Sequence, residues 1–326
     1  MRECTDGGRE PRERRRVGAL SPAPPVPDSP ARRGLPVEVG LSAVVLIWGL
    51  NFAVIKVPLA VMPPFTVNLF RFVVSVGVLG ALHVADARRR GQSPFHSLRV
   101  APWAVLGLGV MAHGVYQGGF ILGIDRVTAG MGALLIATSP LWTALIGHAL
   151  GIDRLRGASW LGVALGLAGA ALVIVGRPES EAEASLSGVV FLLVGSVAWA
   201  LYTVLSRPVF EKGVSPMGFT FWGVLAAMPV IAGLGLWEMG GTRWAEVGAP
   251  EWAAIAFSGG LSTGIAYGLW NAAVRRVGPT RTAMFSNLVP VVGVLAGAVL
   301  LKESVLPLQI AGGVLVIAGL VVMRRA

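Results

Sequence analysis

The sequence contains a single cysteine, Cys4, which lies in an N-terminal segment rich in arginine and proline. A disulfide within the chain and a metal site built from cysteines are therefore both excluded. Charged residues are also scarce, at 13% of the chain against 54% hydrophobic residues, whereas soluble domains carry about a quarter charged residues. We therefore expect most of this chain to lie in a membrane.

The apolar residues are gathered in ten stretches, each close to the roughly 20 residues that a helix needs to cross a bilayer. Backbone polar groups cannot remain unpaired in lipid, and these long runs lack the alternation of barrel strands, so they should be helices. The loops between them are too short for a sizeable soluble domain. We place the spans at residues 37–57, 63–84, 101–122, 127–149, 158–175, 186–206, 216–237, 252–274, 279–301 and 305–323.

The basic residues are distributed unevenly among the loops. The N-terminal tail, alternate loops and the C terminus hold 21 of the 27 Lys and Arg residues, and the other loops hold five. Because cytoplasmic loops are enriched in Lys and Arg, both termini are predicted to face the cytoplasm. The net charge of +10 therefore indicates topology rather than nucleic-acid binding. Residues 1–36 have too little apolar surface to fold and are predicted to be a disordered cytoplasmic tail.

The second five spans repeat the first five at an offset of about 150 residues. Trp48-Gly49-Leu50-Asn51 in the first span corresponds to Trp199-Ala200-Leu201-Tyr202 in the sixth, and Pro140 in the fourth corresponds to Pro290 in the ninth. A carboxylate follows each proline by thirteen residues, at Asp153 and Glu303. An odd number of spans turns the second copy upside down, as in many secondary transporters. We predict an all-α integral membrane protein of two inverted five-helix repeats, at residues 37–176 and 186–323.

The order and spacing of these motifs resemble the EamA type of the drug/metabolite transporter superfamily. The resemblance covers residues 37–323 and rests on Trp48–Lys56, Pro63-Pro64, Arg71-Phe72, Pro290-Val291-Val292, Leu301–Ser304 and Gln309–Gly319. It implies a ten-helix carrier that exports small metabolites, amino acids or drugs through a cavity between its halves, but it implies no particular substrate. The second repeat departs from the first at Arg71, whose equivalent is Trp222.

Polar and aromatic side chains near the middle of the spans are the candidate site. A polar group that faces lipid at this depth is costly, so these groups should point inward. We predict one substrate site formed by Trp48, Asn51, Arg71, His113, Tyr116, Gln117, Tyr202, Tyr267 and Asn287. Pro140 and Pro290 free the carbonyls four residues earlier, and they either shape the cavity as hinges or only bend their helices.

Two of these residues are ionisable in ways that bear on mechanism. Arg71 lies about 12 Å into its span, and no Asp or Glu occurs at mid-depth. It either attracts anions near the pathway, or it snorkels and caps carbonyls as a structural residue. His113 is the candidate proton carrier, against a default role as a packed core histidine. Without a buried carboxylate, no single Asp or Glu should be essential for transport.

The leading function is a secondary transporter that exports small metabolites across the plasma membrane by alternating access. Its partners would be a small-molecule substrate and the lipid bilayer, with no nucleic acid, no cofactor and no metal, in a monomer or a dimer. The alternatives are a lipid-linked sugar flippase, which would want a lateral opening, and an intramembrane enzyme. The enzyme would need a nucleophile, a base or a metal cluster within mutual reach, and the sequence offers no such cluster.

Overall fold

A computed structural model describes residues 37–152, 155, 157–176 and 182–325, and its regular structure is entirely helical. The first repeat contains α1 (Val37–Val54), α2 (Lys56–Leu59), α3 (Pro64–Arg90), α4 (His96–Val100), α5 (Pro102–Gly109), η1 (Val110–Tyr116), α6 (Gln117–Arg126), α7 (Ala129–Ile136), α8 (Ser139–Ala149) and α9 (Gly157–Val175). The second contains α10 (Ala182–Glu211), α11 (Pro216–Glu238), η3 (Met239–Gly241), η4 (Trp244–Glu246), α12 (Ala249–Ala256), η5 (Phe257–Ile265), α13 (Ala266–Val277), α14 (Pro279–Phe285), η6 (Ser286–Leu288), α15 (Val289–Leu300) and α16 (Pro307–Arg325). The predicted tail and Asp153 lie outside the described residues.

Eight helical runs are long and apolar enough to cross a bilayer. Residues 249–277 and α16 form two further helical runs outside this set of eight, which gives ten runs in the described part of the chain. Exposed tryptophans lie near the helix ends: Trp103 and Trp160 near the starts of α5 and α9, and Trp237 at the end of α11. Tryptophan is enriched where a membrane meets water. The chain is an all-α, multi-pass membrane protein, as predicted from its sequence.

The helices begin and end where local chemistry requires it. Five of them open on proline, whose missing N–H would be unpaired in a first turn anyway: α3, α5, α11, α14 and α16. α3 ends at Gly91, which has the left-handed φ of 63° typical of a helix C terminus. Several spans run longer than predicted, since α3 continues to Arg90, α6 to Arg126 and α10 to Glu211.

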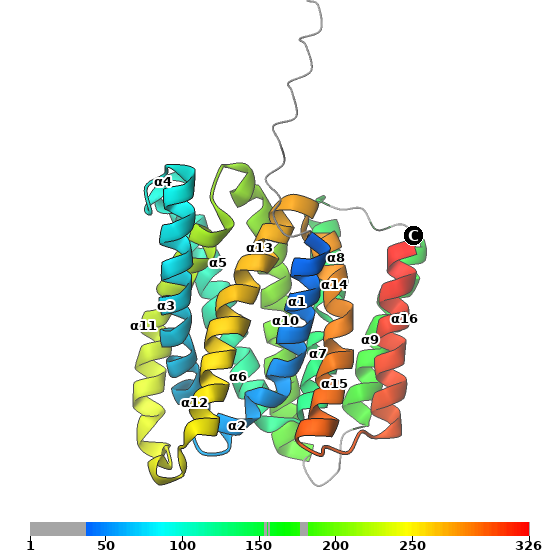
Figure 1. The fold of residues 1–326 in the computed structure, drawn as a ribbon. Coiled ribbons are helices and arrows are strands. Elements are labelled where there is room, and N and C mark those ends of the chain that lie inside the picture. Colours follow the sequence, from blue (N-terminus) through cyan, green and yellow to red (C-terminus); the bar gives the residue numbers. More distant parts are fainter. Residues whose placement is uncertain (1–36, 153–154, 156, 177–181, 326) are drawn as a thin grey trace, which may run out of the picture. The chain divides into compact units, whose positions relative to one another are not determined.

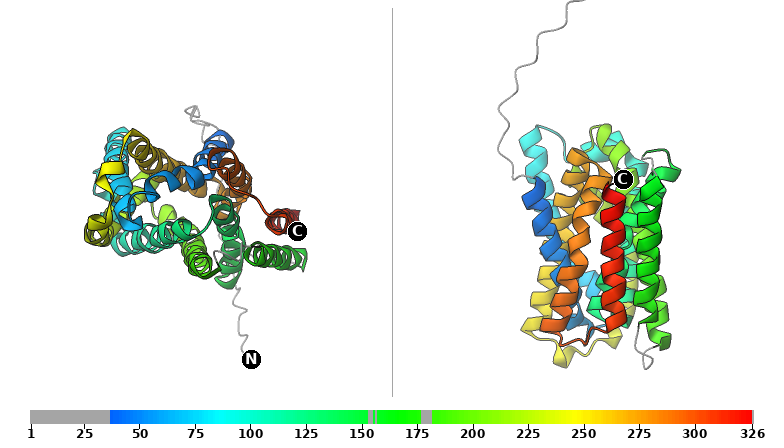
Figure 2. Two further views of the ribbon diagram at one scale, coloured as in Figure 1. Left: turned by 90° about the horizontal axis from the view of Figure 1, so that it is seen from below. Right: turned by 90° about the vertical axis from the view of Figure 1, so that its right-hand side faces the viewer.

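The two repeats run through the bundle in opposite directions (Figure 1): α1 begins at the end of the bundle where α10 finishes. The last helices of the repeats, α9 and α16, pack side by side at the edge of the bundle (Figure 2). Both helices carry several glycines, and small residues let membrane helices approach closely. A Cβ added to Gly162 would lie 2.5 Å from the carbonyl oxygen of Gly319, and one on Gly169 would lie 2.6 Å from that of Gly312.

This contact between α9 and α16 is reciprocal. Gly312 and Gly319 are the equivalents of Gly162 and Gly169 at an offset of 150, so each glycine meets the counterpart of the other. Such an exchange of partners is the mark of a two-fold axis between related elements. The predicted inverted repeat is therefore visible in atomic contacts as well as in helix direction.

Glu303 joins the repeats at the end of the bundle opposite the start of α1. Its Oε1 accepts a hydrogen bond from the N–H of Ala129 at 2.7 Å, and its Oε2 accepts one from Gly130 at 3.0 Å. The first N–H groups of a helix have no partner within the helix, and they attract negative charge. The Thr128 hydroxyl accepts from Met131 at 3.2 Å and completes the cap. This loop carboxylate of the second repeat therefore holds α7 of the first.

Candidate functional site

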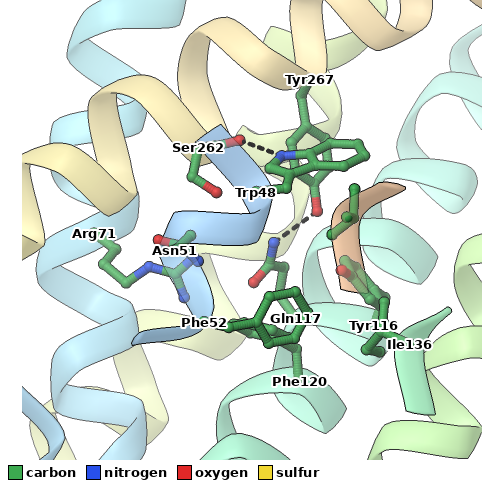
Figure 3. A pocket seen from close by; sticks show the side chains of 11 residues that line it. Trp48, Asn51, Phe52, Arg71, Tyr116, Gln117, Phe120, Ile136, Ser262 and Tyr267 are labelled. Carbon is green, nitrogen blue, oxygen red and sulfur yellow. Dashed lines mark hydrogen bonds between the residues drawn. The ribbon is translucent and has the colours of Figure 1, made fainter. Parts of the chain in front are cut away.

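A cavity lies at the centre of the bundle, between helices of both repeats (Figure 3). Its volume is about 30 Å³, which is room for little more than one or two water molecules. The walls are therefore close together, and a solute the size of an amino acid would have to push them apart. The lining residues are Trp48, Asn51, Phe52, Arg71, Tyr116, Gln117, Phe120, Ile136, Ser262, Tyr267 and Val289.

Six of the nine residues that the sequence predicts for the substrate site line this cavity. They are Trp48, Asn51, Arg71, Tyr116, Gln117 and Tyr267. The Gln117 amide nitrogen donates a hydrogen bond to the Tyr267 hydroxyl at 2.6 Å, and the Trp48 indole donates to the Ser262 carbonyl at 3.0 Å. Both bonds run between the repeats, so the cavity wall is shared by the two halves.

Three predicted site residues do not line the cavity. The His113 ring lies behind the wall, with its centroid 5.0 Å from that of Tyr267, and neither ring nitrogen has a hydrogen-bond partner. Tyr202 accepts a hydrogen bond from the Asn271 amide at 2.7 Å, away from the cavity. Asn287 lies in η6, two residues before the lining residue Val289. All nine residues were predicted from their position near the middle of a span, and this position alone does not distinguish the six that line the cavity from the three that do not.

The remaining lining residues could have been found in part from helical spacing. Phe52 follows Trp48 by four residues and Phe120 follows Tyr116 by four, so each pair shares a helix face. Their rings meet across the cavity with centroids 5.6 Å apart. Ser262 contributes through its backbone carbonyl, for which the sequence carries no signal.

Both predicted proline breaks lie at the cavity wall. Pro140 removes a donor for the Ile136 carbonyl, which accepts instead from the Ser139 hydroxyl at 2.6 Å. In the second repeat, Pro290 follows the lining residue Val289, and the 3-10 turn η6 separates α14 from α15, which packs against α7. Ile136 is itself a lining residue. The helices are thus interrupted at the cavity, where proline has already removed a backbone hydrogen bond that a shift of the wall would otherwise have to break.

A second pair of irregular helices presents the two tyrosines. The π-helical segment η1 ends at Tyr116, and η5 ends two residues before Tyr267. π-helical turns are rare and occur often at functional sites. They occupy corresponding positions in the two repeats, yet no sequence feature used above predicts them. The glycines around them, such as Gly114 and Gly264, are the only visible signal.

The cavity is closed on one side by a cluster of aromatic rings. The centroids of Trp48, Trp199 and Trp270 lie 5.1 to 5.5 Å from one another. Trp48 and Trp199 are repeat equivalents in direct edge-to-face contact, so they lie beside the pseudo-two-fold axis. Beyond Trp199, the rings of Tyr202 and Phe219 stack at 5.4 Å and fill the space toward the end of α10. The structure therefore shows the site shut toward that end of the bundle.

Arg71 is the one charged side chain among the described lining residues. It is 1% exposed, and it does not snorkel to the surface. Its guanidinium donates to Asn68 Oδ1 at 2.9 Å and to Thr263 Oγ1 at 3.2 Å, and it lies 5.8 Å from the Phe120 ring centroid. No carboxylate of the described residues forms an ion pair with it.

His83 is a second buried histidine of the spans, beside His113, which the sequence predicts as the candidate proton carrier. His83 is also buried inside a spanning helix, α3, at 3% exposure. One ring nitrogen hydrogen-bonds the Pro94 carbonyl at 2.9 Å, and the ring stacks on Phe221. Because it has these partners far from the lining residues, His83 has a structural explanation that His113 lacks.

The sequence profile of the EamA-like transporter family matches residues 36–175 and, a second time, residues 186–325. The chain belongs to the EamA-like transporter family. The resemblance seen in the motifs is thereby confirmed, and each of the two matches covers five of the ten helical runs.

Known relatives of this EamA-like transporter span nearly its whole length. A protein of Salmonella typhimurium named a probable amino-acid metabolite efflux pump is 29% identical over 85% of this chain and 91% of its own. A protein of Escherichia coli K12 with the same name is 27% identical over 85% and 91%. The uncharacterized inner membrane transporter YedA of Escherichia coli K12 is 27% identical over 88% and 90%. A solved crystal structure of a protein 22% identical to this chain has the same fold, with a TM-score of 0.66, covering 89% of this chain and 98% of the other.

Proposed function

We propose that this EamA-like transporter exports small metabolites, such as amino acids, related solutes or drugs, across the plasma membrane by alternating access. The observation that carries the proposal is the central cavity, which both repeats line and which both proline breaks border. Such a site at a repeat interface, flanked by broken helices, is the common design of secondary transporters. The moving halves are the repeats at residues 37–176 and 186–323.

The lining residues favour a zwitterionic or amphipathic solute over a phosphate ester. Five of the eleven are aromatic, and the polar ones are two amides, a serine and one arginine. Small-molecule sites are mostly apolar walls with a few placed polar groups. The names of the Salmonella and Escherichia relatives, probable amino-acid metabolite efflux pumps, support the same class of substrate.

The orientation follows from the loop charges. With 21 Lys and Arg residues in the tail, alternate loops and C terminus, both termini are placed in the cytoplasm. The name of the inner membrane transporter YedA supports the plasma membrane as the location.

An intramembrane enzyme is disfavoured by the same cavity. Among the described lining residues there is no histidine, carboxylate or thiol that could act as a nucleophile or a base. The lipid-linked sugar flippase remains a distinct outcome of the test below, because its substrate would enter from the side.

Counterflow in proteoliposomes tests the proposal. Vesicles preloaded with an unlabelled amino-acid mixture should take up trace labelled amino acids only when they contain the protein. Asn51→Ala should lower the uptake rate, while Trp103→Ala, at a tryptophan 85% exposed outside the cavity, should not. Chemically altered label would point to an enzyme. Protein-dependent movement of a lipid-linked sugar, with no amino-acid uptake, would point to the flippase.

A further inference from the structure

Three polar side chains of the central cavity have hydrogen-bonding atoms without partners. The Arg71 Nε has no acceptor, and the amide oxygens of Asn51 and Gln117 have no donor. All three residues line the cavity and are at most 4% exposed. Buried polar atoms are normally paired, and each that is not calls for an explanation.

The unpaired atoms differ in kind, and the difference is informative. Arg71 offers a cationic donor, which is complementary to a carboxylate. Asn51 and Gln117 offer neutral acceptors, which are complementary to an ammonium group. The aromatic rings of Trp48 and Tyr116 on the same wall also attract a cation.

The charge of Arg71 is a stronger indication that the cavity lacks a binding partner. A buried cation inside a membrane protein is expensive unless an opposite charge or several hydrogen bonds accompany it. Its two partners, Asn68 and Thr263, are both neutral. The groups that surround it are the Phe120 ring and the tyrosines of η1 and α13, and none of the described ones carries a negative charge at neutral pH. Among the described residues, Arg71 therefore has no opposite charge beside it.

We infer that the cavity recognises the zwitterionic head of an α-amino acid, with its carboxylate on Arg71 and its ammonium on the amide oxygens of Asn51 and Gln117. The apolar side chain lies against Phe52 and Phe120. This inference rests on the proposed function and narrows its substrate to solutes that carry both groups. Arginine suits the role because its planar fork can bind both oxygens of a carboxylate.

The cavity must widen to admit such a solute, and the structure provides the means. The two proline breaks at Ile136 and Val289 lie on the wall. A shift of α7 or α15 at these breaks moves the apolar side of the cavity while α3 keeps Arg71 in place. A phosphate monoester fits less well, since its two charges would face a single guanidinium.

Ligand-induced thermal stabilisation of the purified protein tests the assignment, because a ligand that binds the folded state raises the unfolding temperature. The probes are leucine, leucine methyl ester, 3-methylbutylamine, 4-methylpentanoate and inorganic phosphate. Leucine should stabilise most, and the ester, amine and acid, which each lack one charged group, should bind at least roughly tenfold more weakly. Phenylalanine and its matching analogues repeat the series with a larger side chain.

Variants assign the two ends of the ligand. Arg71→Gln should abolish the advantage of leucine over its methyl ester, and Gln117→Leu should abolish its advantage over 4-methylpentanoate. Asn51→Asp supplies a carboxylate within the cavity that can pair with Arg71 in place of the carboxylate of the ligand. This variant should therefore favour 3-methylbutylamine over leucine, and it tests the role of Arg71 even if Arg71→Gln does not fold. Arg90→Gln makes the same chemical change at an exposed surface pair and should leave the ranking unchanged.

The outcomes separate this inference from the proposed function. Equal binding of leucine and its ester by the unchanged protein, or an unchanged ranking in both Arg71→Gln and Asn51→Asp, would overturn the inference. If counterflow then carries amines or drugs, the transporter function stands without it. If no amino acid shifts the unfolding temperature, the inference is also overturned. Counterflow of related metabolites and drugs then decides separately whether the protein is a transporter.

Discussion

Replacing Glu303 by glutamine should lower the stability of the protein while preserving transport. In the native chain one carboxylate satisfies two N–H groups at the start of α7, those of Ala129 and Gly130, at 2.7 and 3.0 Å. Glutamine retains one acceptor oxygen and replaces the other by an amide nitrogen, which cannot accept. One of the two N–H groups therefore loses its partner, and the helix start loses a negative charge.

The magnitude follows from these two losses. A hydrogen bond to a charged group contributes about 1.5–3 kcal/mol, and a charge at a helix N terminus adds about 0.3–1 kcal/mol. Glu303 is only half-buried, so water can replace part of the lost bond, and we expect a net loss of about 1–3 kcal/mol. Because the contact joins the repeats, the loss should appear in the main unfolding transition rather than as local fraying.

Thermal unfolding in detergent, followed by tryptophan fluorescence, measures the effect. Glu211→Gln is the matched control, since that carboxylate is exposed and forms a surface ion pair with Arg207. The control should unfold at the native temperature, and both variants should show counterflow. An unchanged unfolding temperature for Glu303→Gln would refute the capping argument. A stable Glu303→Gln protein that no longer transports would refute the claim that no single carboxylate is essential.

Three further predictions concern packing, coupling and topology. Gly169→Val should destabilise the protein by about 1–3 kcal/mol, because its Cβ would lie 2.6 Å from a carbonyl oxygen of α16. Gly233→Val is the control and should not destabilise it, since a Cβ there has nothing within 4 Å. Equal unfolding temperatures of the two variants would contradict the reciprocal contact. His113→Gln should remove any dependence of transport on a pH gradient and keep solute exchange, and a native protein without such dependence would return His113 to a packing role. In a cysteine-free background, a membrane-impermeant thiol reagent should label Gly240→Cys but not Arg89→Cys on intact cells, and the opposite pattern would invert the proposed topology.

The fold could be predicted from the sequence because lipid leaves few alternatives. Apolar runs of spanning length must be helices, and the repeated Trp48 and Trp199 motifs disclose the duplication. The glycines of α9 and α16 indicate close helix packing, but the sequence does not say that these two helices are each other's partners. Helix ends were less accessible, because the sequence does not mark where α3 and α10 leave the bilayer.

The site could be predicted only to the level of depth along each span. Depth placed Asn51, Arg71 and Gln117 correctly at one cavity, since each also faces inward. His113 and Tyr202 do not line this cavity: the His113 ring lies behind Tyr267, and Tyr202 is hydrogen-bonded to Asn271. The rotation of a helix about its axis depends on packing partners, and the π-helical turns before Tyr116 and Tyr267 change that rotation locally. A single sequence carries little information about either.

The reciprocal glycine contacts show two symmetric halves, yet the central cavity has a charged residue from one half alone. In a homodimer of five-helix chains every residue occurs twice, so a cation at the position of Arg71 would be accompanied by a second cation at the position of Trp222. Joining both halves in one chain removes that constraint. Here the counterpart of Arg71 is Trp222, whose indole hydrogen-bonds the Pro94 carbonyl of a loop. Fusion thus preserves the symmetry of the frame while allowing a single charge at its centre.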